Sequence, residues 1–483
     1  MNFKVVLRSL GILLVCEAIS LIPSLIVSII YKDNDTAAFL YTMLIIFAVA
    51  LPLIRINVKQ KNMYSRDGFA IVALGWILMS IFGALPFYLS GAIPSFIDCF
   101  FETSSGLTTT GASILTNVEL LPRGLLFWRS FTHWIGGMGV IVFTLAILPH
   151  GGAGAMQMMI AESPGPNPGK LVPKVGETAK LLYGIYAAIT ALEIILLVVA
   201  GMPVYDSFIH AFGTVGTGGF SNMNASVGAY KNVYIEIIIT VFMFLSAVNF
   251  GLYYRLIKEG IKSFLHDEEF KFFSFVVFIS ILLITVDLNL NIYKGFFESV
   301  RYAAFQVVSV ISTTGYATTD FNQWSMFSKA ILFVLMFIGG CAGSTGGAIK
   351  NIRVLLLFKM MKRELQQIIH PKAVFSIRLA NKRVEERTLL EVLGFFFMYI
   401  AVFVIGVLVV SLDNLDWGTT ITSVAATLGN IGPGFGMVGA VGNFSAMSDL
   451  SKMVLSLCMI VGRLEIYPIL LLMMPSFWKR VNI

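Results

Sequence analysis

Long apolar stretches dominate the sequence, and their length determines the class of protein. Ten of them reach the roughly 20 residues that a helix needs to cross a bilayer. They cover about residues 4–31, 37–57, 68–92, 123–149, 177–201, 230–258, 270–291, 325–363, 388–412 and 450–475. Only 13% of the residues are charged, against about 25% in a soluble domain. We therefore expect an all-α integral membrane protein whose surroundings are a lipid bilayer.

The basic residues lie at alternate ends of these stretches rather than in a domain of their own. Examples are Lys4 and Arg8, the segment from Arg55 to Arg66, and the basic run from Lys350 to Arg387. Cytoplasmic loops of membrane proteins carry such an excess of lysine and arginine. The pattern places both termini in the cytoplasm. It leaves no soluble basic domain to bind nucleic acid, although the net charge is +7.

Four parts of the chain repeat one order of segments: an apolar span, a short polar segment ending in a threonine- and glycine-rich turn, and a second span. The turns are Thr108–Ser113, Val215–Phe220, Ser312–Ala317 and Gly429–Gly434. Their fourth positions are Gly111, Gly218, Gly315 and Gly432, at intervals of 107, 97 and 117 residues. The repetition predicts four helix–loop–helix repeats, at residues 68–149, 177–258, 270–363 and 388–475, after an extra helical pair in residues 1–57.

The segment before each turn is too short to cross a bilayer. These segments are Pro94–Leu107, Val204–Thr214, Phe296–Ile311 and Trp417–Leu428. Apolar segments of this length are often re-entrant, and non-helical backbone at membrane depth is tolerated only where it is buried in protein or lines a water-filled cavity. We therefore expect four short helices that enter from the outer face and place their turns around one pore with pseudo-fourfold symmetry.

Turns of this composition suit a cation. Glycine lets the backbone approach an ion closely, a ring of backbone carbonyls can replace the hydration shell of K⁺, and the C-terminal ends of four short helices favour positive charge. The predicted K⁺ filter consists of Thr109, Thr110, Gly111, Ala112, Gly216, Thr217, Gly218, Gly219, Thr313, Thr314, Gly315, Tyr316, Asn430, Ile431, Gly432 and Pro433. The alternative is a set of ordinary glycine turns, but four of them at matching positions argue against it.

The second span of the third repeat, residues 325–363, is too long for one crossing and is interrupted by a glycine-rich run. Glycine costs a helix about 1 kcal/mol per residue relative to alanine, so the run should not be helical. By symmetry it lies below the filter, and we interpret it as a gate. The gate residues are Gly339, Gly340, Gly343, Ser344, Thr345, Gly346 and Gly347, together with Arg463. A hinge or a close-packing site is the alternative. The GxxxxGK[ST] pattern of a phosphate-binding loop is absent.

Arg463 lies inside the last span, where a charge is rare and should face the interior or a partner. Our hypothesis is that it binds carbonyls of the glycine-rich run and repels cations, which holds the pore shut. A structural pair with a buried acid is the alternative. Acids near the outer ends of the short segments are Asp98, Glu102, Asp206, Glu298 and Asp416. They either concentrate cations at the mouth or complement the helix starts, and the sequence leaves both roles open.

Three motifs resemble the Trk/Ktr family of potassium transporters. They are TTTGAS with the following HWIGGMG at His133–Gly139, GGCAGSTGGAIK at Gly339–Lys350, and GNIGPGFG at Gly429–Gly436. The arginine of the last span matches as well, and the two extra N-terminal spans are similar to the Trk branch. The resemblance covers nearly the whole chain.

Several expectations follow from the resemblance alone. It implies a homodimer in the bacterial inner membrane, in which each protomer has its own pore of potassium-channel-like helix–pore-loop–helix units. It also implies cytosolic nucleotide-binding regulatory (TrkA-like) subunits. The basic run from Lys350 to Arg387 and the loop around Lys170 to Lys180 are the expected docking faces. The fourth turn departs from the pattern, since Asn430-Ile431 replaces threonine there.

The sequence thus predicts potassium uptake through a gated, channel-like pore, with K⁺ as the permeant ion and no organic cofactor. A Na⁺- or H⁺-coupled potassium symporter is the alternative. It would need an ionisable site at the midplane, for which Glu17, Glu193 and Glu236 are available. A receptor or scaffold would leave the four turns unexplained. No nucleophile–base arrangement stands out, so we do not expect an enzyme.

Overall fold

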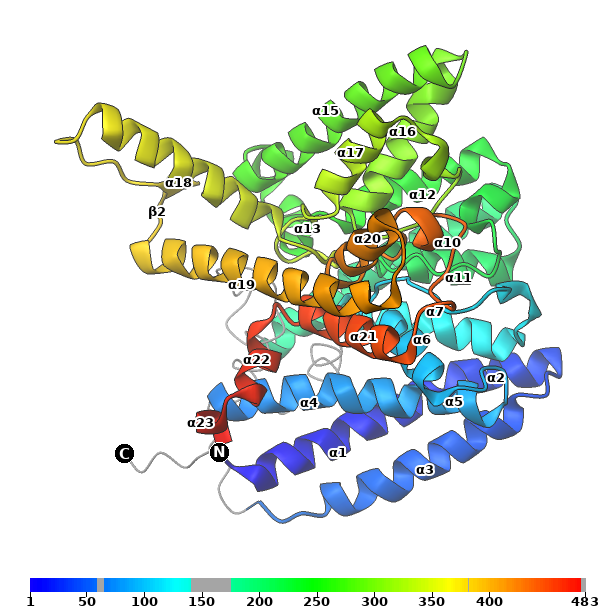
Figure 1. The fold of residues 1–483 in the computed structure, drawn as a ribbon. Coiled ribbons are helices and arrows are strands. Elements are labelled where there is room, and N and C mark those ends of the chain that lie inside the picture. Colours follow the sequence, from blue (N-terminus) through cyan, green and yellow to red (C-terminus); the bar gives the residue numbers. More distant parts are fainter. Residues whose placement is uncertain (59–64, 140–174, 381, 479–483) are drawn as a thin grey trace.

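The computed structural model describes residues 1–58, 65–139, 175–380 and 382–478 (Figure 1). An extra helical pair comes first, formed by α1 (Phe3–Ser20), α2 (Ile22–Tyr31) and α3 (Thr36–Ile54). The helices α1 and α2 continue one another across Leu21, and α1 packs against α3 and against α4 (Ser65–Gly83), the first helix of the first repeat.

Four repeats of long and short helices follow. The first adds α5 (Leu85–Leu89), α6 (Phe96–Leu107), η1 (Val118–Leu120) and α7 (Arg123–Gly137). The second has α10 (Val175–Val199), α11 (Val204–Val215), η2 (Ser226–Tyr230), α12 (Val233–Ser246), α13 (Phe250–Glu259) and α14 (Ile261–Leu265). The third has α15 (Glu268–Asn291), α16 (Phe296–Ile311), η3 (Phe321–Gln323), α17 (Met326–Leu335) and α18 (Asn351–Ile369). The fourth has α19 (Glu386–Val410), η4 (Ser411–Asp413), α20 (Trp417–Leu428), η5 (Gly436–Val438), α21 (Asp449–Arg463), α22 (Tyr467–Met473) and α23 (Pro475–Trp478).

Eight of the ten predicted spans coincide with described helices that are long and apolar enough to cross a membrane. Six are continuous, and two are helix pairs that bend, by 88° between α12 and α13 and by 120° between α21 and α22. Of the predicted span 123–149, the structure describes α7 and two further residues, while 140–149 lie outside the described residues. The predicted span 325–363 is divided into α17 and α18 by residues 336–350, as the glycine-rich run requires.

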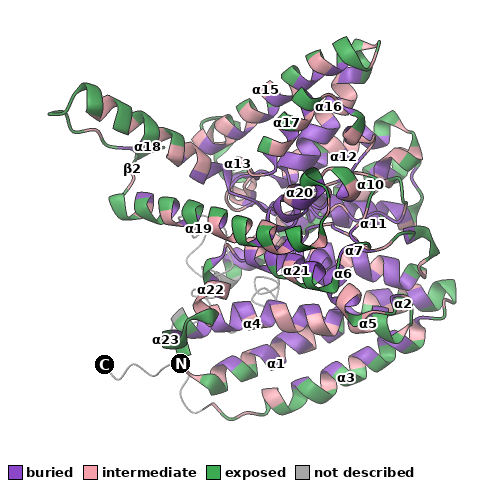
Figure 2. Cartoon of the chain, in the orientation of Figure 1, coloured by how far each residue is buried: buried purple, intermediate pink, exposed green. Residues whose placement is uncertain are grey.

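The four short helices α6, α11, α16 and α20 lie at the centre of the molecule, inside the long helices (Figures 1 and 2). Every residue in the ranges 101–110, 211–218, 305–314 and 422–432 is buried. The outer surfaces of α3 and α19 expose large apolar side chains such as Leu44, Ile405 and Phe397. A lipid-facing exterior around a buried centre with polar groups is the arrangement expected of a membrane protein.

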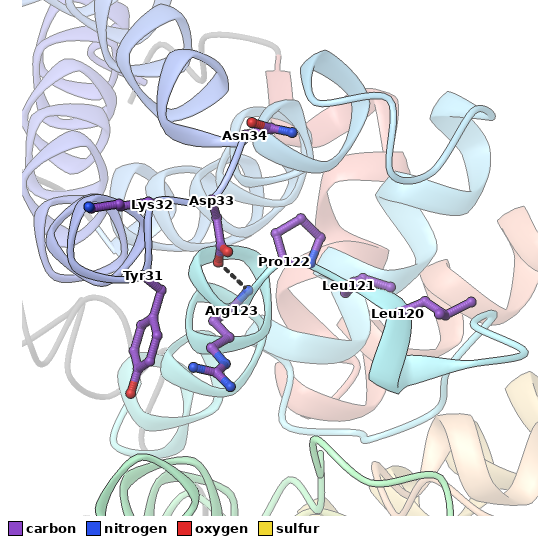
Figure 3. A pocket seen from close by; sticks show the side chains of 8 residues that line it. All are labelled: Tyr31, Lys32, Asp33, Asn34, Leu120, Leu121, Pro122 and Arg123. Atoms are coloured by element: carbon purple, nitrogen blue, oxygen red, sulfur yellow. Dashed lines mark hydrogen bonds between the residues drawn. The ribbon is translucent and has the colours of Figure 1, made fainter.

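A projecting helix pair and a surface hollow lie at opposite ends of the molecule. The helices α18 and α19 extend beyond the body, and the chain that connects them contains the two-residue strands β1 (Arg378–Leu379) and β2 (Lys382–Arg383), which pair antiparallel (Figure 1). At the other end, a hollow of about 510 Å³ lies between Tyr31–Asn34 and Leu120–Arg123 (Figure 3). There Asp33 accepts the backbone N–H of Arg123 at 2.7 Å, and the Arg123 guanidinium lies 4.2 Å from the Tyr31 ring centre. These contacts attach the extra helical pair to the start of α7.

Candidate ion-conduction site

The four short helices end in the same backbone motif. In each, one N–H bonds to the carbonyl three residues earlier, and the next N–H bonds to the carbonyl five residues before it. The pairs are Thr109 to Gly106 and Thr110 to Ser105, Thr217 to Thr214 and Gly218 to Gly213, Thr313 to Val310 and Thr314 to Ser309, and Asn430 to Thr427 and Ile431 to Ala426. This is the Schellman ending of a helix, in which the residue after the cap is left-handed. Its φ is 55° at Thr109, 55° at Thr217, 62° at Thr313 and 53° at Asn430.

These hydrogen bonds set the register of the four turns and correct one alignment. The glycines that follow with positive φ are Gly111 (82°), Gly219 (75°), Gly315 (81°) and Gly432 (99°). The equivalent of Gly111 in the second turn is therefore Gly219, and the prediction of Gly218 was wrong by one residue. Two adjacent glycines fit the letter pattern equally well, and only the backbone decides between them. Phe220, rather than Gly219, then matches Ala112 and Tyr316.

The backbone of the turns directs carbonyl groups away from the short helices. In a trans peptide the N–H and the preceding C=O point in opposite directions. Because the N–H groups of the Schellman endings bond back to their helices, the carbonyls of Thr109, Thr217, Thr313 and Asn430 face the opposite side.

The four turns close into a ring in which each glycine lies against a carbonyl of the next turn. A Cβ added to each glycine would lie too close to a carbonyl oxygen of the next turn. The distances are 2.0 Å from Gly111 to the Gly218 oxygen, 2.0 Å from Gly219 to the Thr314 oxygen, 1.9 Å from Gly315 to the Ile431 oxygen and 2.7 Å from Gly432 to the Thr110 oxygen. A side chain does not fit at any of these four points. The absence of a side chain and the positive φ both require glycine here.

Threonine in three of the Schellman positions is a costly choice. A left-handed conformation costs an L-residue roughly 1–2 kcal/mol, and a β-branched residue there is an outlier. Glycine would remove that cost, yet Thr109, Thr217 and Thr313 are retained. In the corrected register the three threonines share one level with Asn430. Strain of this kind gathers at functional sites, which indicates that the side chains at this level are used.

A buried ion pair braces the first and second turns from behind. Arg129 Nε lies 2.6 Å from Glu102 Oε1, and both side chains are at most 3% exposed. Glu102 also accepts hydrogen bonds from the Ser113 hydroxyl and the Ile114 N–H, while Arg129 donates to the Ser221 carbonyl at 3.0 Å. The pair thus connects the segments that follow both turns. Arg129 was not singled out from the sequence, although an arginine inside an apolar span was a signal for it.

Aromatic residues connect the neighbouring turns. His133 Nδ1 lies 2.7 Å from the Gly106 carbonyl and its Nε2 lies 3.3 Å from the Phe220 N–H, which fits a neutral ring protonated at Nδ1. The Tyr316 hydroxyl lies 3.1 Å from the carbonyls of His210 and Phe220, so the third turn is attached to the second.

Asn430 turns its amide away from the axis. Its Nδ2 donates to Thr110 Oγ1 and to the Met459 carbonyl, both at 2.9 Å. The Thr110 hydroxyl lies in turn 2.8 Å from that of Thr108. The asparagine of the fourth turn therefore supports the first turn and the last long helix, α21.

The glycine-rich loop, Gly339–Gly347, lies directly against the third and fourth turns. The Gly347 N–H donates to Thr313 Oγ1 at 2.7 Å, and a Cβ on Gly347 would lie 2.5 Å from the Gly429 carbonyl. The loop also reaches α12, because Thr345 Oγ1 donates to the Ser246 carbonyl at 3.1 Å. The predicted gate residues are thus placed at the end of the ring where the short helices terminate.

Arg463 joins the loop to the first repeat. Its guanidinium donates to the Thr345 carbonyl and to the carbonyls of Gly136 and Gly137, each at 2.6 Å. Lys350 donates to the Gly346 carbonyl. The neighbouring acid Glu465 pairs with Arg353 at 2.5 Å. The arginine therefore contacts loop carbonyls, as the hypothesis requires, and it bridges the loop to the end of α7.

The acids near the outer ends of the short helices have different surroundings. Asp98 pairs with Lys452 at 2.7 Å. Asp206 accepts hydrogen bonds from Asn222 Nδ2 and the Tyr230 hydroxyl, both at 2.8 Å. Asp416 caps α20, and hydrogen bonds from the Thr419 hydroxyl and N–H hold the pKa of Asp416 below its ordinary value. Glu298 is exposed. Most of these acids thus have structural partners.

Known proteins are similar to this chain over nearly its whole length. The profile of the TrkH family, described as cation transport protein, matches residues 35–480. The chain belongs to the TrkH family. "Trk system potassium uptake protein TrkH" of Escherichia coli K12 is 40% identical, with 99% of this chain and 100% of that protein covered. The Halomonas elongata "Trk system potassium uptake protein TrkI" is 34% identical over 98% of this chain and 97% of its own.

A solved structure shows the same fold. The crystal structure of the potassium transporter TrkH from Vibrio parahaemolyticus matches with a TM-score of 0.89 and 35% identity, covering 99% of this chain and 100% of that one. The resemblance to the Trk branch is confirmed, and so is the all-α membrane fold. TrkH is a family of cation transporters, so the expectation that the chain is not an enzyme is confirmed as well.

Proposed function

We propose that this TrkH-family chain takes up potassium across the bacterial inner membrane through a gated, channel-like pore. The observation that carries the proposal is the closed ring of the four turns, in which the glycine of each turn lies against a carbonyl of the next. Carbonyl oxygens at fixed positions replace the hydration shell of K⁺. The C-terminal ends of α6, α11, α16 and α20 add partial negative charge to the same space.

The filter in this proposal is the ring together with the threonine level. Its residues are the sixteen predicted ones, with Phe220 added by the corrected register of the second turn. Thr109, Thr217 and Thr313 supply hydroxyl oxygens next to their carbonyls, and the strain they carry supports a direct role. Because the Asn430 amide bonds to Thr110 and Met459, the side chains at this level that contact the ion come from the first three turns only.

The glycine-rich loop is the proposed gate, with Arg463 as its latch. The loop lies where an ion leaving the ring would pass, and its Gly347 contacts Thr313. A guanidinium beside that path repels cations at short range. Opening would then require the loop to leave the carbonyl contacts that Arg463 makes with Thr345 and with the end of α7.

Two of the three intramembrane acids lie away from the ring, while the third, Glu193, is buried on α10. Glu236 pairs with Arg301 at 3.3 Å, on α12 and α16. Glu17 is buried beside Gly83, where α1 meets α4. Neither is part of the ring, so we propose that the membrane potential drives uptake. It supplies about 2.3 kcal/mol per elementary charge at 100 mV.

The assembly belongs to the same proposal. Relatives are named as parts of a Trk system, and we propose a homodimer that binds cytosolic nucleotide-binding (TrkA-like) subunits. The projecting pair of α18 and α19 carries the basic run from Lys350 to Arg387 and is the proposed docking face (Figure 1). In the other expected face, Lys170 to Lys180, residues 170–174 lie outside the described residues. Both termini lie in the cytoplasm in this arrangement.

The deciding experiment is ⁸⁶Rb⁺ uptake into liposomes that contain the purified chain alone. We expect uptake to follow an imposed potential and to proceed without a Na⁺ or H⁺ gradient. Excess unlabelled K⁺ should compete with ⁸⁶Rb⁺ far better than excess Na⁺. Strict dependence on a Na⁺ or H⁺ gradient would contradict the pore and favour the symporter.

A further inference from the structure

The glycine-rich loop has a fixed point at its cytoplasmic side that belongs to neither the ring nor Arg463. Glu269 lies in the first turn of α15. Its Oε1 accepts the backbone N–H of Ala342 at 2.7 Å and that of Ile352 at 3.0 Å. Ala342 lies within the loop and Ile352 lies in the first turn of α18, so one carboxylate oxygen connects the glycine-rich loop to the start of α18.

The position of the carboxylate makes these bonds strong. Glu269 is only 9% exposed, and hydrogen bonds that an ionised carboxylate accepts are about twice as strong as neutral ones. The start of α18 also carries partial positive charge, which favours a carboxylate. Capping α18 alone would need only the bond to Ile352. The second bond, to Ala342, reaches back into the loop and serves no helix.

The neighbouring acid points to a different part of the molecule. Glu268 pairs with Lys359 of α18 and accepts the backbone N–H of Ala380 at 3.0 Å, in the connection between α18 and α19. Within the described part of the chain, Glu268 makes no hydrogen bond or ion pair with the glycine-rich loop. The two adjacent carboxylates thus have different partners: Glu269 binds the loop, and Glu268 binds α18 and the connection to α19. This gives a matched control for Glu269.

We infer that Glu269 is a positioning residue that holds the glycine-rich loop against the ring through Ala342 and Ile352. The inference rests on the proposed function for its consequence, because only a loop that acts as a gate turns this contact into control of flux. Release of the loop requires both hydrogen bonds to Glu269 to break. Removing the carboxylate should therefore favour the released conformation even where Arg463 is intact.

The loop carries its own reporter. Cys341 precedes Ala342, is 1% exposed, and its N–H donates to the Ala247 carbonyl at 2.8 Å. The chain has four cysteines, and replacing Cys16, Cys99 and Cys458 with alanine leaves Cys341 as the single thiol. Its reaction rate with N-ethylmaleimide then measures how often the loop leaves its site. A second background that keeps only Cys458, buried in α21, reports general loosening.

The experiment measures both rates in purified protein for Glu269→Ala and Glu268→Ala. We expect Glu269→Ala to raise the Cys341 rate about tenfold or more while the Cys458 rate stays unchanged, and Glu268→Ala to leave both rates unchanged. An unchanged Cys341 rate in Glu269→Ala overturns the inference, as does an equal rise at Cys458. Where Glu269→Ala does not yield folded protein, Glu269→Gln replaces it. A rise of several-fold at Cys341 then supports the inference, and no rise overturns it.

Flux separates this inference from the proposed gate. In liposomes, Glu269→Ala should raise ⁸⁶Rb⁺ uptake several-fold together with the Cys341 rate. A raised thiol rate with unchanged uptake keeps Glu269 as the holder of the loop and refutes the loop as the gate. Raised uptake with an unchanged thiol rate refutes the role of Glu269 in holding the loop.

Discussion

Gly111→Ala tests whether the four turns form one mechanical unit. The added Cβ would lie 2.0 Å from the Gly218 carbonyl oxygen. An ordinary contact needs roughly 3.5 Å, so the second turn must move by about 1.5 Å. The variant also places alanine at a φ of 82°, which costs roughly 1–2 kcal/mol. Gly111→Ala thus combines backbone strain with displacement of a carbonyl in the neighbouring repeat.

Gly91→Ala is the matched control. Gly91 has a φ of 72° and nothing within 4 Å of its added Cβ, so this variant carries the backbone strain without the displacement. Overpacking a well-packed site costs about 1–3 kcal/mol, and a barrier raised by about 1.4 kcal/mol slows a process tenfold. We expect Gly111→Ala to lose at least about tenfold in ⁸⁶Rb⁺ uptake, and Gly91→Ala to transport like the parent.

Uptake is measured in liposomes that hold equal amounts of each purified variant, alongside thermal unfolding in detergent. Both variants should unfold at slightly lower temperature than the parent, because both carry the same backbone strain. Equal uptake by Gly111→Ala and Gly91→Ala would refute the closed ring, since a carbonyl that can move 1.5 Å without effect is not part of a coordinating site.

Three further predictions concern the groups around the ring. Arg463→Ala should raise ⁸⁶Rb⁺ uptake several-fold in a folded variant, because the loop loses its bond at Thr345; unchanged or lower uptake would contradict the latch. Arg129→Ala should lower the free energy of unfolding by about 3–5 kcal/mol, because it leaves Glu102 charged and buried without its partner. Denaturant unfolding measures this loss. The double variant Arg129→Ala with Glu102→Gln should recover part of it. Asn430→Thr should weaken the preference for K⁺ over Na⁺ in competition assays, because the shorter side chain cannot bond to Met459. An improved preference would show that a fourth threonine matters more than the brace.

The sequence predicts the arrangement of this fold because its main signals are local. Apolar length indicates the spans, and the short segments before each turn are recognisable from their length and position. The interruption between α17 and α18 follows from the glycines of residues 339–347. Each of these features depends on a few neighbouring residues and on the thickness of a bilayer, so no knowledge of tertiary contacts is needed.

The details of the site depend on contacts that sequence spacing does not contain. Either Gly218 or Gly219 could have matched Gly111, and the choice follows from the positive φ of Thr217 and Gly219. The bracing pair of Glu102 and Arg129 joins residues 27 positions apart, and nothing in either segment alone indicates the other. The reasoning applied to Arg463, that a charge in a span needs a partner, would have identified Arg129 as well.

The ring of four turns is built from one chain, and this has a consequence for how such a site can change. In an assembly of four identical subunits, one altered codon changes four positions at once. Here it changes a single quadrant, so Asn430 can differ from its three threonine counterparts without being copied to them. The glycine-rich loop shows the same inequality, because Gly347 contacts the third and fourth quadrants. When such a loop moves, it exposes the third and fourth turns to the cytoplasm before the other two. The ring then opens from one side.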